Sequence, residues 1–343
     1  MKSTSGIVDA IGIGTGVVAL LAVALVASGH DAGAALAAMW RGSLGSSYAF
    51  LSATLVRSIP LALTGTAIAI AFRAGVLNIG AEGQFLAGAT AAAAISVRWG
   101  SAGVAILPVA LVAGALCGAL WAGIAAFLRG RFHVLEVIST IMLNFIALHA
   151  VGYLVRGPLQ EATHIYPQTE TFAVALRLPA IIRGTRLHLG FVIAVVVAAG
   201  AWFVLRGTAA GFRARATGLN PHAAFAAGLI HTGRVTAMVF LASGAIAGLA
   251  GAVEVHGVTY ALYENISPGY GYTAIAVALL ARLNPLFVLP SAMFFGALEA
   301  GAAAMQRDAG VPSVVVSVVE ALVILLVVAA DRVRERRLKL AAA

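Results

Sequence analysis

Polar side chains and glycines interrupt an apolar region in the first quarter of the chain. The stretch reads "FRAGVLNIGAEGQFLAGA" and covers residues 72–89. It contains the polar residues Arg73, Asn78, Glu82 and Gln84 and the glycines Gly75, Gly80 and Gly83. Ionisable groups at membrane depth are costly unless they are paired or hydrated, so they mark candidate functional sites. Glycines let a helix stop and restart, and a broken backbone is tolerated only against protein or a wet cavity. The stretch therefore predicts a broken helix whose polar side chains face protein or a water-filled path.

A polar stripe is predicted on the apolar run at 133–155. Glu136, Thr140 and Asn144 recur at four-residue spacing, which places them on one face of a helix. This face meets protein or water rather than lipid. The stripe either lines a substrate path or joins neighbouring helices by hydrogen bonds, and both readings stay open.

Other titratable groups fall inside or near the ends of apolar runs. Glu254 and His256 are expected at the membrane surface, because they lie near the outer end of their run. Arg57, Glu299 and Glu320 lie deeper. The two glutamates either pair with Arg57 or line a path.

A second interrupted segment occurs in the other half of the chain. In "ENISPGYGYTAIAVALLARLNP", residues 264–285, Pro268, Gly269 and Gly271 precede an apolar run that is too short to cross a membrane alone. Two interrupted segments, one in each half, are the sequence indication of a substrate path near the middle of the membrane.

Several kinds of catalytic and cofactor chemistry are excluded. The only lysines are Lys2 and Lys339, and neither follows a glycine-rich loop, so the chain cannot carry the Walker A loop of an ATP hydrolase. It contains no His-Glu-x-x-His, Gly-x-Ser-x-Gly or Cys-x-x-Cys pattern, and its single cysteine, Cys117, allows no internal disulfide. We therefore predict no catalytic residue, no metal and no cofactor, and a membrane-embedded enzyme is the least favoured class.

The composition requires membrane-spanning helices to position these residues. Of the 343 residues, 61% are hydrophobic and 10% charged, whereas soluble domains carry about 25% charged residues. Apolar runs occur near 9–29, 49–72, 80–97, 103–127, 133–155, 188–206, 235–256, 271–281, 287–305 and 313–331. We expect an all-α, polytopic membrane protein of about ten transmembrane helices, forming a single domain over residues 1–343. The first run is interpreted as a retained helix, with a cleaved signal peptide as the alternative.

The distribution of arginine and lysine predicts the topology. If both termini are cytoplasmic, the inside segments hold fourteen of these residues and the outside segments seven, which follows the positive-inside rule. The basic charge is thus a topology signal and indicates no nucleic-acid partner. Residues 156–187 are predicted to form an extracytoplasmic loop, residues 206–234 a cytoplasmic loop with a short helix at 221–230, and residues 332–343 a basic cytoplasmic tail.

Five motifs occur in an order that resembles one transporter family. They are "AFRAGVLNIGAEGQFLAGA", "EVISTIMLNFIA", "RATGLNPHAAFAAGL", "SGAIAGLAG" and "GYGYTAIAVALLARLNP". Together, from about residue 50 to 330, they resemble the permease subunits of bacterial ABC importers for nucleosides and simple sugars. This branch belongs to the broader group of ribose and branched-chain amino acid permeases.

The resemblance implies a type II importer permease in the bacterial inner membrane. It also implies three partner proteins: a second, related permease forming a heterodimer, an ABC ATPase with two nucleotide-binding domains, and an extracytoplasmic substrate-binding lipoprotein. Membrane lipid and a small-molecule substrate complete the set of partners.

The resemblance also assigns residues. Asn78, Gly80, Glu82, Gly83 and Gln84 match the family's Asn-Ile-Gly-x-Glu-Gly-Gln signature. The matching residues of the cytoplasmic segment that would form the coupling helix are Gly218, Asn220, Pro221, Ala223, Ala224 and Gly228. We expect the substrate path to include Asn78, Glu82, Gln84, Glu136 and Asn144.

Alternatives remain at three points. An ion-coupled secondary transporter could also use intramembrane carboxylates and broken helices. The substrate can be a purine nucleoside, a pyrimidine nucleoside or a sugar. Glu82 either contacts substrate or only holds the break together.

Overall fold

The structure, a computed structural model, is built from helices. It describes residues 31–228 and 231–312 throughout, together with single positions between 16 and 29 and between 314 and 325. Within these described residues the only extended pairings are isolated bridges. The predicted runs at 9–29 and 313–331 cannot be followed as helices there, and Glu320 and the tail at 332–343 lie outside the described residues.

The chain divides into two compact units. One is continuous and covers Ser58–Met293, and it contains all the residues predicted for the substrate path and the coupling helix. The other combines Met1–Arg57 with Phe294–Ala343.

In the second unit the structure reveals a helix that the sequence analysis did not predict. Helix α2, Ala32–Ser43, begins at Asp31, whose carboxylate accepts hydrogen bonds from the first-turn N–H groups of Gly33 and Ala34 at 2.8 and 3.1 Å. It is followed by α3, Ser47–Ala49, and a π-helical turn, Phe50–Thr54. Small residues let α2 approach the later part of α13 (Pro285–Ala309), since a Cβ on Gly301 would lie 2.4 Å from Met39 Cγ.

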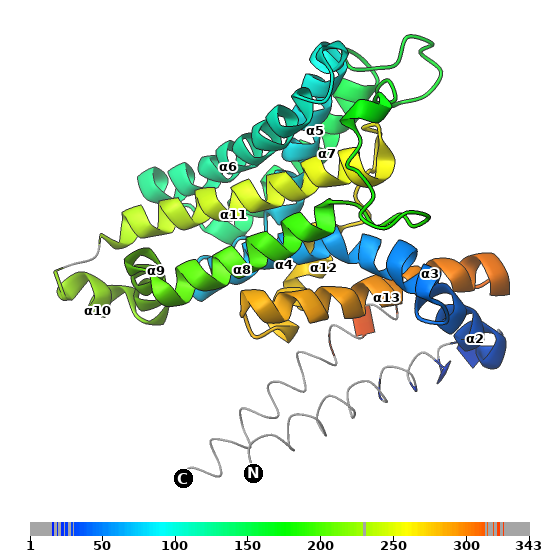
Figure 1. Ribbon diagram of the computed structural model, residues 1–343. Helices are drawn as coiled ribbons and strands as arrows, with labels where there is room; N and C mark the ends of the chain where they lie inside the picture. Colours follow the sequence, from blue (N-terminus) through cyan, green and yellow to red (C-terminus); the bar gives the residue numbers. More distant parts are fainter. Residues whose placement is uncertain are drawn as a thin grey trace. The chain divides into compact units, whose positions relative to one another are not determined.

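The core of the larger unit is a set of three helices packed through glycines. Figure 1 shows α5, α6 and α11 running side by side. Their bounds are Ala81–Trp99, Ile106–Phe132 and Thr232–Glu254. A Cβ on Gly88 of α5 would lie 2.2 Å from the carbonyl oxygen of Gly248, and one on Gly118 of α6 would lie 2.4 Å from that of Gly244. Because helix association in a membrane depends on close packing rather than on hydrophobic exclusion, these glycines set how near the helices come.

Five of the remaining helices correspond to predicted apolar runs: α4 Leu55–Arg73, α7 Glu136–Val155, α8 Gly190–Gly207, α12 Tyr270–Leu280 and α13. Helix α10, Pro221–Ala226, lies within the short cytoplasmic helix predicted at 221–230. Helix α9, Ala209–Leu219, was not predicted, because this part of the cytoplasmic segment was expected to be a loop. Six helices of the described part are long and apolar enough to cross a membrane, so the chain is a multi-pass membrane protein, although the predicted count of ten is not confirmed.

Helix α5 is long enough to cross but is not among those six. Its first turn carries Glu82 and Gln84, and its last turn Arg98. Twelve of its nineteen residues are buried by its neighbours. A helix enclosed by protein does not need a lipid-compatible surface, which explains how polar groups are tolerated on it.

The predicted loop at 156–187 is non-helical apart from the single turn Val174–Leu176. It is hydrogen-bonded along the segment after α11: Thr169 N–H donates to the Leu262 carbonyl and Leu178 N–H to the His256 carbonyl, both at 2.8 Å. Because this loop covers the end of α11, the expected position of Glu254 and His256 at the membrane surface is wrong. Glu254 and His256 are only 4% and 0% exposed, so they lie inside the protein and not at the membrane surface.

Two histidines are buried beneath this loop. His256 Nε2 lies 2.8 Å from Ser96 Oγ, and its Nδ1 lies 2.8 Å from the Ala252 carbonyl. His188, just before α8, is 2% exposed and accepts a hydrogen bond from Gly190 N–H through Nδ1. Burial, with a smaller contribution from the Arg186 charge, lowers the pKa of His188 to about 4.

Candidate functional site

The predicted helix break is present between α4 and α5. Helix α4 ends at Arg73, α5 begins at Ala81, and residues 74–80 between them are not helical. Gly75 adopts φ +73°, a conformation that glycine accepts without strain. Val76 N–H returns to the Ala71 carbonyl at 3.0 Å and so closes the end of α4. The glycines and polar residues therefore form the break that their pattern predicts.

Asn78 and Gln84 form a reciprocal amide pair at the centre of the break. Asn78 Nδ2 donates to Gln84 Oε1 at 3.0 Å, and Gln84 Nε2 donates to Asn78 Oδ1 at 2.9 Å. Asn78 Nδ2 also donates to Ser243 Oγ on α11 at 2.9 Å, and Asn78 Oδ1 accepts from Gly80 N–H at 3.0 Å. Both side chains are buried, with 0% and 1% exposure. The pair ties the start of α5 to α11 and satisfies backbone groups that the break leaves free.

The polar stripe of α7 holds the same break from another side. Asn144 Oδ1 accepts from Gly83 N–H at 2.8 Å, and its Nδ2 donates to the Ile79 carbonyl at 2.9 Å. Glu136 Oε1 accepts from Leu77 N–H at 2.8 Å, and its carboxylate forms an ion pair with Arg129 at the end of α6. The stripe thus makes the interhelical hydrogen bonds that were one of its two predicted roles.

Glu82 joins the two interrupted segments. Its carboxylate accepts a hydrogen bond at 2.7 Å from the N–H of Gly271, in the first turn of α12, and it also bonds the Ser267 hydroxyl. A Cβ on Gly271 would lie 2.3 Å from Glu82 N, so only glycine fits at this contact. A negative charge at a helix N-terminus is stabilised by the free N–H groups and the dipole of that helix. The starts of α5 and α12, 189 residues apart in the sequence, therefore meet at one carboxylate.

All five residues predicted for the substrate path lie around the break, where Asn78, Glu82, Gln84 and Asn144 are buried and Glu136 is half-buried. Each has a hydrogen-bond partner in the structure, and these partners lie in the break, in the first turn of α5, on α11 or at the start of α12. Their role in shaping the break is visible, while their contact with substrate stays a prediction. Among the described residues no group of three or more His, Cys, Asp or Glu side chains is arranged to hold a metal ion.

The predicted coupling segment begins where the sequence indicates. Asn220 Oδ1 accepts from Ala223 N–H at 3.0 Å, and Pro221 occupies the first position of α10. Helix α10 ends at Ala226, earlier than the predicted 230, and Gly228 follows it with φ +72°. Residues 229 and 230 lie outside the described residues.

Helix α10 has a buried and an exposed side. Ala224 is 6% exposed and packs inward, whereas Phe225 is 65% exposed. Leu219, just before the helix, is 88% exposed. These two large apolar side chains make the coupling segment a candidate surface for a partner protein.

The coupling segment touches the helix break directly through backbone atoms. A Cβ on Gly218 would lie 2.3 Å from the Arg73 carbonyl oxygen, and one on Gly75 would lie 3.1 Å from Gly218 Cα. Two glycines therefore bring the end of α9 against the start of the break.

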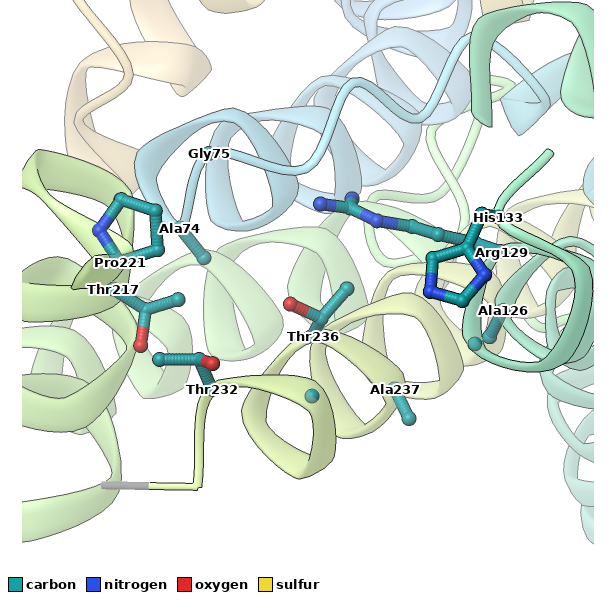
Figure 2. A pocket seen from close by; sticks show the side chains of 13 residues that line it. Ala74, Gly75, Ala126, Arg129, His133, Thr217, Pro221, Thr232, Thr236 and Ala237 are labelled. Carbon is teal, nitrogen blue, oxygen red and sulfur yellow. The ribbon is translucent and has the colours of Figure 1, made fainter. Parts of the chain in front are cut away.

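Beside this contact lies a cavity of about 320 Å³. Figure 2 shows Arg129 and His133 on one side of it and Thr217, Thr232 and Pro221 on the other. Thr217 Oγ1 is buried and has no hydrogen-bond partner. The cavity lies between the end of α6 and the predicted coupling segment.

Sequence reasoning missed several partners in this site. Ser243 binds Asn78 across 165 residues, Arg129 pairs with Glu136, and Gly218 packs on the break. Ser243 lies in the motif "SGAIAGLAG" and Gly218 in "RATGLNPHAAFAAGL". The motifs mark both positions, but spacing along the chain does not say which helices face each other.

Comparison with known proteins gives one family and several relatives. The model of the permease component of branched-chain amino acid transport systems matches residues 50–328. A guanosine ABC transporter permease protein of Bacillus subtilis is 38% identical over 91% of this chain and 90% of its own length. A glucose ABC transporter permease protein of Haloferax volcanii is 37% identical over 93% of this chain and 86% of its own. A second guanosine permease protein of Bacillus subtilis is 29% identical over 71% of this chain and 78% of its own. No solved structure matches.

Proposed function

The chain belongs to the family of permease components of branched-chain amino acid transport systems, and from this membership we propose that it moves a nucleoside or a simple sugar across the bacterial inner membrane. It is a permease subunit of an ATP-driven importer, a transport component and not an enzyme, and ATP hydrolysis belongs to a separate chain. The observation that carries the substrate class is the similarity to permeases named for guanosine and for glucose over most of their length. These two compounds share a polyhydroxylated sugar ring.

The proposed complex contains three further kinds of chain. Bacillus subtilis has two guanosine permeases, and both are similar to this chain, which supports a heterodimer of related permeases. An ABC ATPase would bind at the cytoplasmic side, and a substrate-binding lipoprotein would deliver substrate from outside. The distribution of arginine and lysine supports a topology in which both termini are cytoplasmic.

The contacts of the described helices support a specific coupling route. Closure of the ATPase on ATP moves α10, and Gly218 transmits the movement to Gly75 because their backbones are in contact. The displaced break leads directly into the first turn of α5, where Glu82 holds the start of α12 through Gly271. We place Asn78, Glu82, Gln84, Glu136 and Asn144 beside the substrate path, where a shift of the break would open or close it. In this route the chain supplies the substrate path and the helix α10 that moves it, and the ATPase supplies the energy.

An uptake measurement tests the function. The chain is reconstituted into proteoliposomes with its proposed partner permease, ATPase and lipoprotein, and uptake of labelled guanosine, uridine and glucose is measured with and without ATP inside. We expect ATP-dependent uptake of one of these compounds. Uptake that instead follows a proton or sodium gradient without ATP would favour the ion-coupled secondary transporter.

A substitution on α10 tests the coupling segment. Replacing Phe225 with alanine removes the exposed aromatic side chain that is best placed to contact the ATPase. Truncating such an anchor costs about 2 kcal/mol or more, equal to roughly 30-fold in affinity. Substrate-stimulated ATP hydrolysis and co-purification of the ATPase should both fall.

The matched control is Phe287→Ala, on a side chain that is 61% exposed at the start of α13 and outside the coupling segment. This variant should assemble normally. Equal activity of the two variants would remove Phe225 from the ATPase contact.

A further inference from the structure

Three arginines surround a small cavity where α4, α8 and α9 lie near one another. The cavity has a volume of about 30 Å³ and is lined by Arg73, Arg206 and Arg215 together with Trp202. Among the described residues that line it there is no carboxylate. A concentration of guanidinium groups without a carboxylate is unfavourable unless an anion from elsewhere neutralises it.

In the part of the chain that the structure describes, no carboxylate pairs with these arginines, of which Arg73 and Arg206 are exposed and Arg215 is half-buried. Arg215 Nη1 is buried and has no hydrogen-bond partner. Arg206 lies over the indole ring of Trp202 at 5.6 Å, and Arg73 Nη1 reaches only a backbone carbonyl, that of Arg282, at 3.4 Å. A buried donor without a partner costs about 1 to 3 kcal/mol, more when it is charged. The cavity is therefore suited to an acceptor with several negatively charged oxygens, and Arg binds phosphate in this manner.

The position of the cavity indicates the source of such an anion. Arg206 is in the last turn of α8, a helix whose outer face carries Val196, Phe203 and Val204 at 62%, 61% and 45% exposure. These apolar side chains are exposed to hydrocarbon in a multi-pass membrane protein. Trp202 lies one turn before Arg206, as aromatic residues do at the boundary between hydrocarbon and headgroups. The cavity thus lies at the basic end of an apolar helix with an exposed apolar face, which is where a lipid headgroup is expected.

We propose that this arginine cavity binds the phosphate of an anionic phospholipid of the cytoplasmic leaflet, whose acyl chains lie along the exposed face of α8. The bound lipid would join the ends of α4, α8 and α9, close to the Gly218 contact that carries the coupling route. The site rests on the chain being in a membrane and not on the identity of the transported compound. The phosphate could also belong to a soluble anion, so the test separates these two sources.

Native mass spectrometry of the full chain in detergent measures the binding of phosphatidylglycerol and of phosphatidylcholine. We expect preferential binding of phosphatidylglycerol, weakened about fivefold by Arg206→Gln and by Arg215→Gln, since each arginine near an anionic surface contributes about 1 kcal/mol. Arg213→Gln makes the same change of charge on an exposed residue that does not line the cavity, and it should leave binding unchanged. Thermal unfolding of each variant establishes that it is folded, and Arg206→Lys should retain part of the preference.

Three results would overturn the proposal. Equal binding of the two lipids would remove the charge recognition, and an equal loss in Arg213→Gln would make it a diffuse surface effect. Displacement of phosphatidylglycerol by millimolar inorganic phosphate would assign the cavity to a soluble anion. Failure of guanosine or glucose uptake would leave the lipid result unaffected, because the binding measurement involves neither.

Discussion

A double-mutant cycle on Asn78 and Gln84 measures how strongly the helix break is held. Asn78 takes part in four hydrogen bonds, two of them shared with Gln84. At about 1 kcal/mol of net stability for each bond, Asn78→Ala should destabilise the chain by about 4 kcal/mol and Gln84→Ala by about 2 kcal/mol. The double variant loses the two shared bonds only once, so the coupling free energy should be about 2 kcal/mol. Hydrogen bonds between membrane helices often measure nearer 0.6 kcal/mol, which sets a lower expectation of about 1 kcal/mol.

The assay is unfolding in mixed micelles by increasing dodecyl sulfate, followed by circular dichroism. A control cycle pairs Asn78→Ala with Thr90→Ala, because the Thr90 hydroxyl bonds the Leu86 carbonyl within its own helix at 2.8 Å and shares no partner with Asn78. In this control cycle, the destabilisation of the double variant should equal the sum of the two single destabilisations to within about 0.5 kcal/mol. Equally additive behaviour of Asn78 and Gln84 would refute the reasoning, since the two amides would then bond water or substrate instead of each other.

Two further predictions concern packing and pH. Gly88→Ala should cost about 3 kcal/mol and lower the yield of monodisperse protein in size-exclusion chromatography, because its Cβ would lie 2.2 Å from a backbone oxygen. Gly130→Ala, with nothing within 4 Å, should be harmless, and a similar loss in both variants would contradict the glycine contact. Burial lowers the pKa of His188 from about 6.5 in the unfolded chain to about 4 in the folded chain, so the folded state favours the neutral imidazole. The folded chain is therefore most stable above pH 6.5 and loses stability as the pH falls from 6.5 through 4. The free energy of unfolding should fall by about 3 kcal/mol across this pH range, as measured by thermal unfolding. The His188→Asn variant should lose this pH dependence. If that variant keeps the same dependence of stability on pH, other titratable groups cause it.

The sequence predicts the helix break well because its signal is local. Gly75, Asn78 and Glu82 stand out in an apolar region, and their residue types alone require a turn and a protein or water environment. The start of α10 is predictable for the same reason, since Asn220 and Pro221 together form a helix start. The partners of the break are not predictable in this way. Ser243 and Gly271 meet it across more than 160 residues, and helical periodicity gives the face of a helix but not the neighbour.

Two of the misjudged regions have clear physical causes. Helix α2 has only 12 residues, fewer than a membrane crossing needs, so a search for apolar runs of membrane-spanning length does not find it. Glu254 and His256 were placed at the membrane surface because they lie near a helix end. The loop at 156–187 covers that end, and nothing in the loop sequence shows where it folds back.

The enclosure of α5 has a consequence for how the chain is synthesised. A segment enters the bilayer from the translocon on the strength of its own hydrophobicity, and charged residues within it oppose entry. Helix α5 carries Glu82, Gln84 and Arg98 and becomes stable only when α6 and α11 surround it. Its neighbour α11 is made more than 130 residues later. The nascent chain therefore has to keep α5 beside α6, or in the company of a chaperone, until α11 emerges, which makes the order of synthesis a condition of correct assembly.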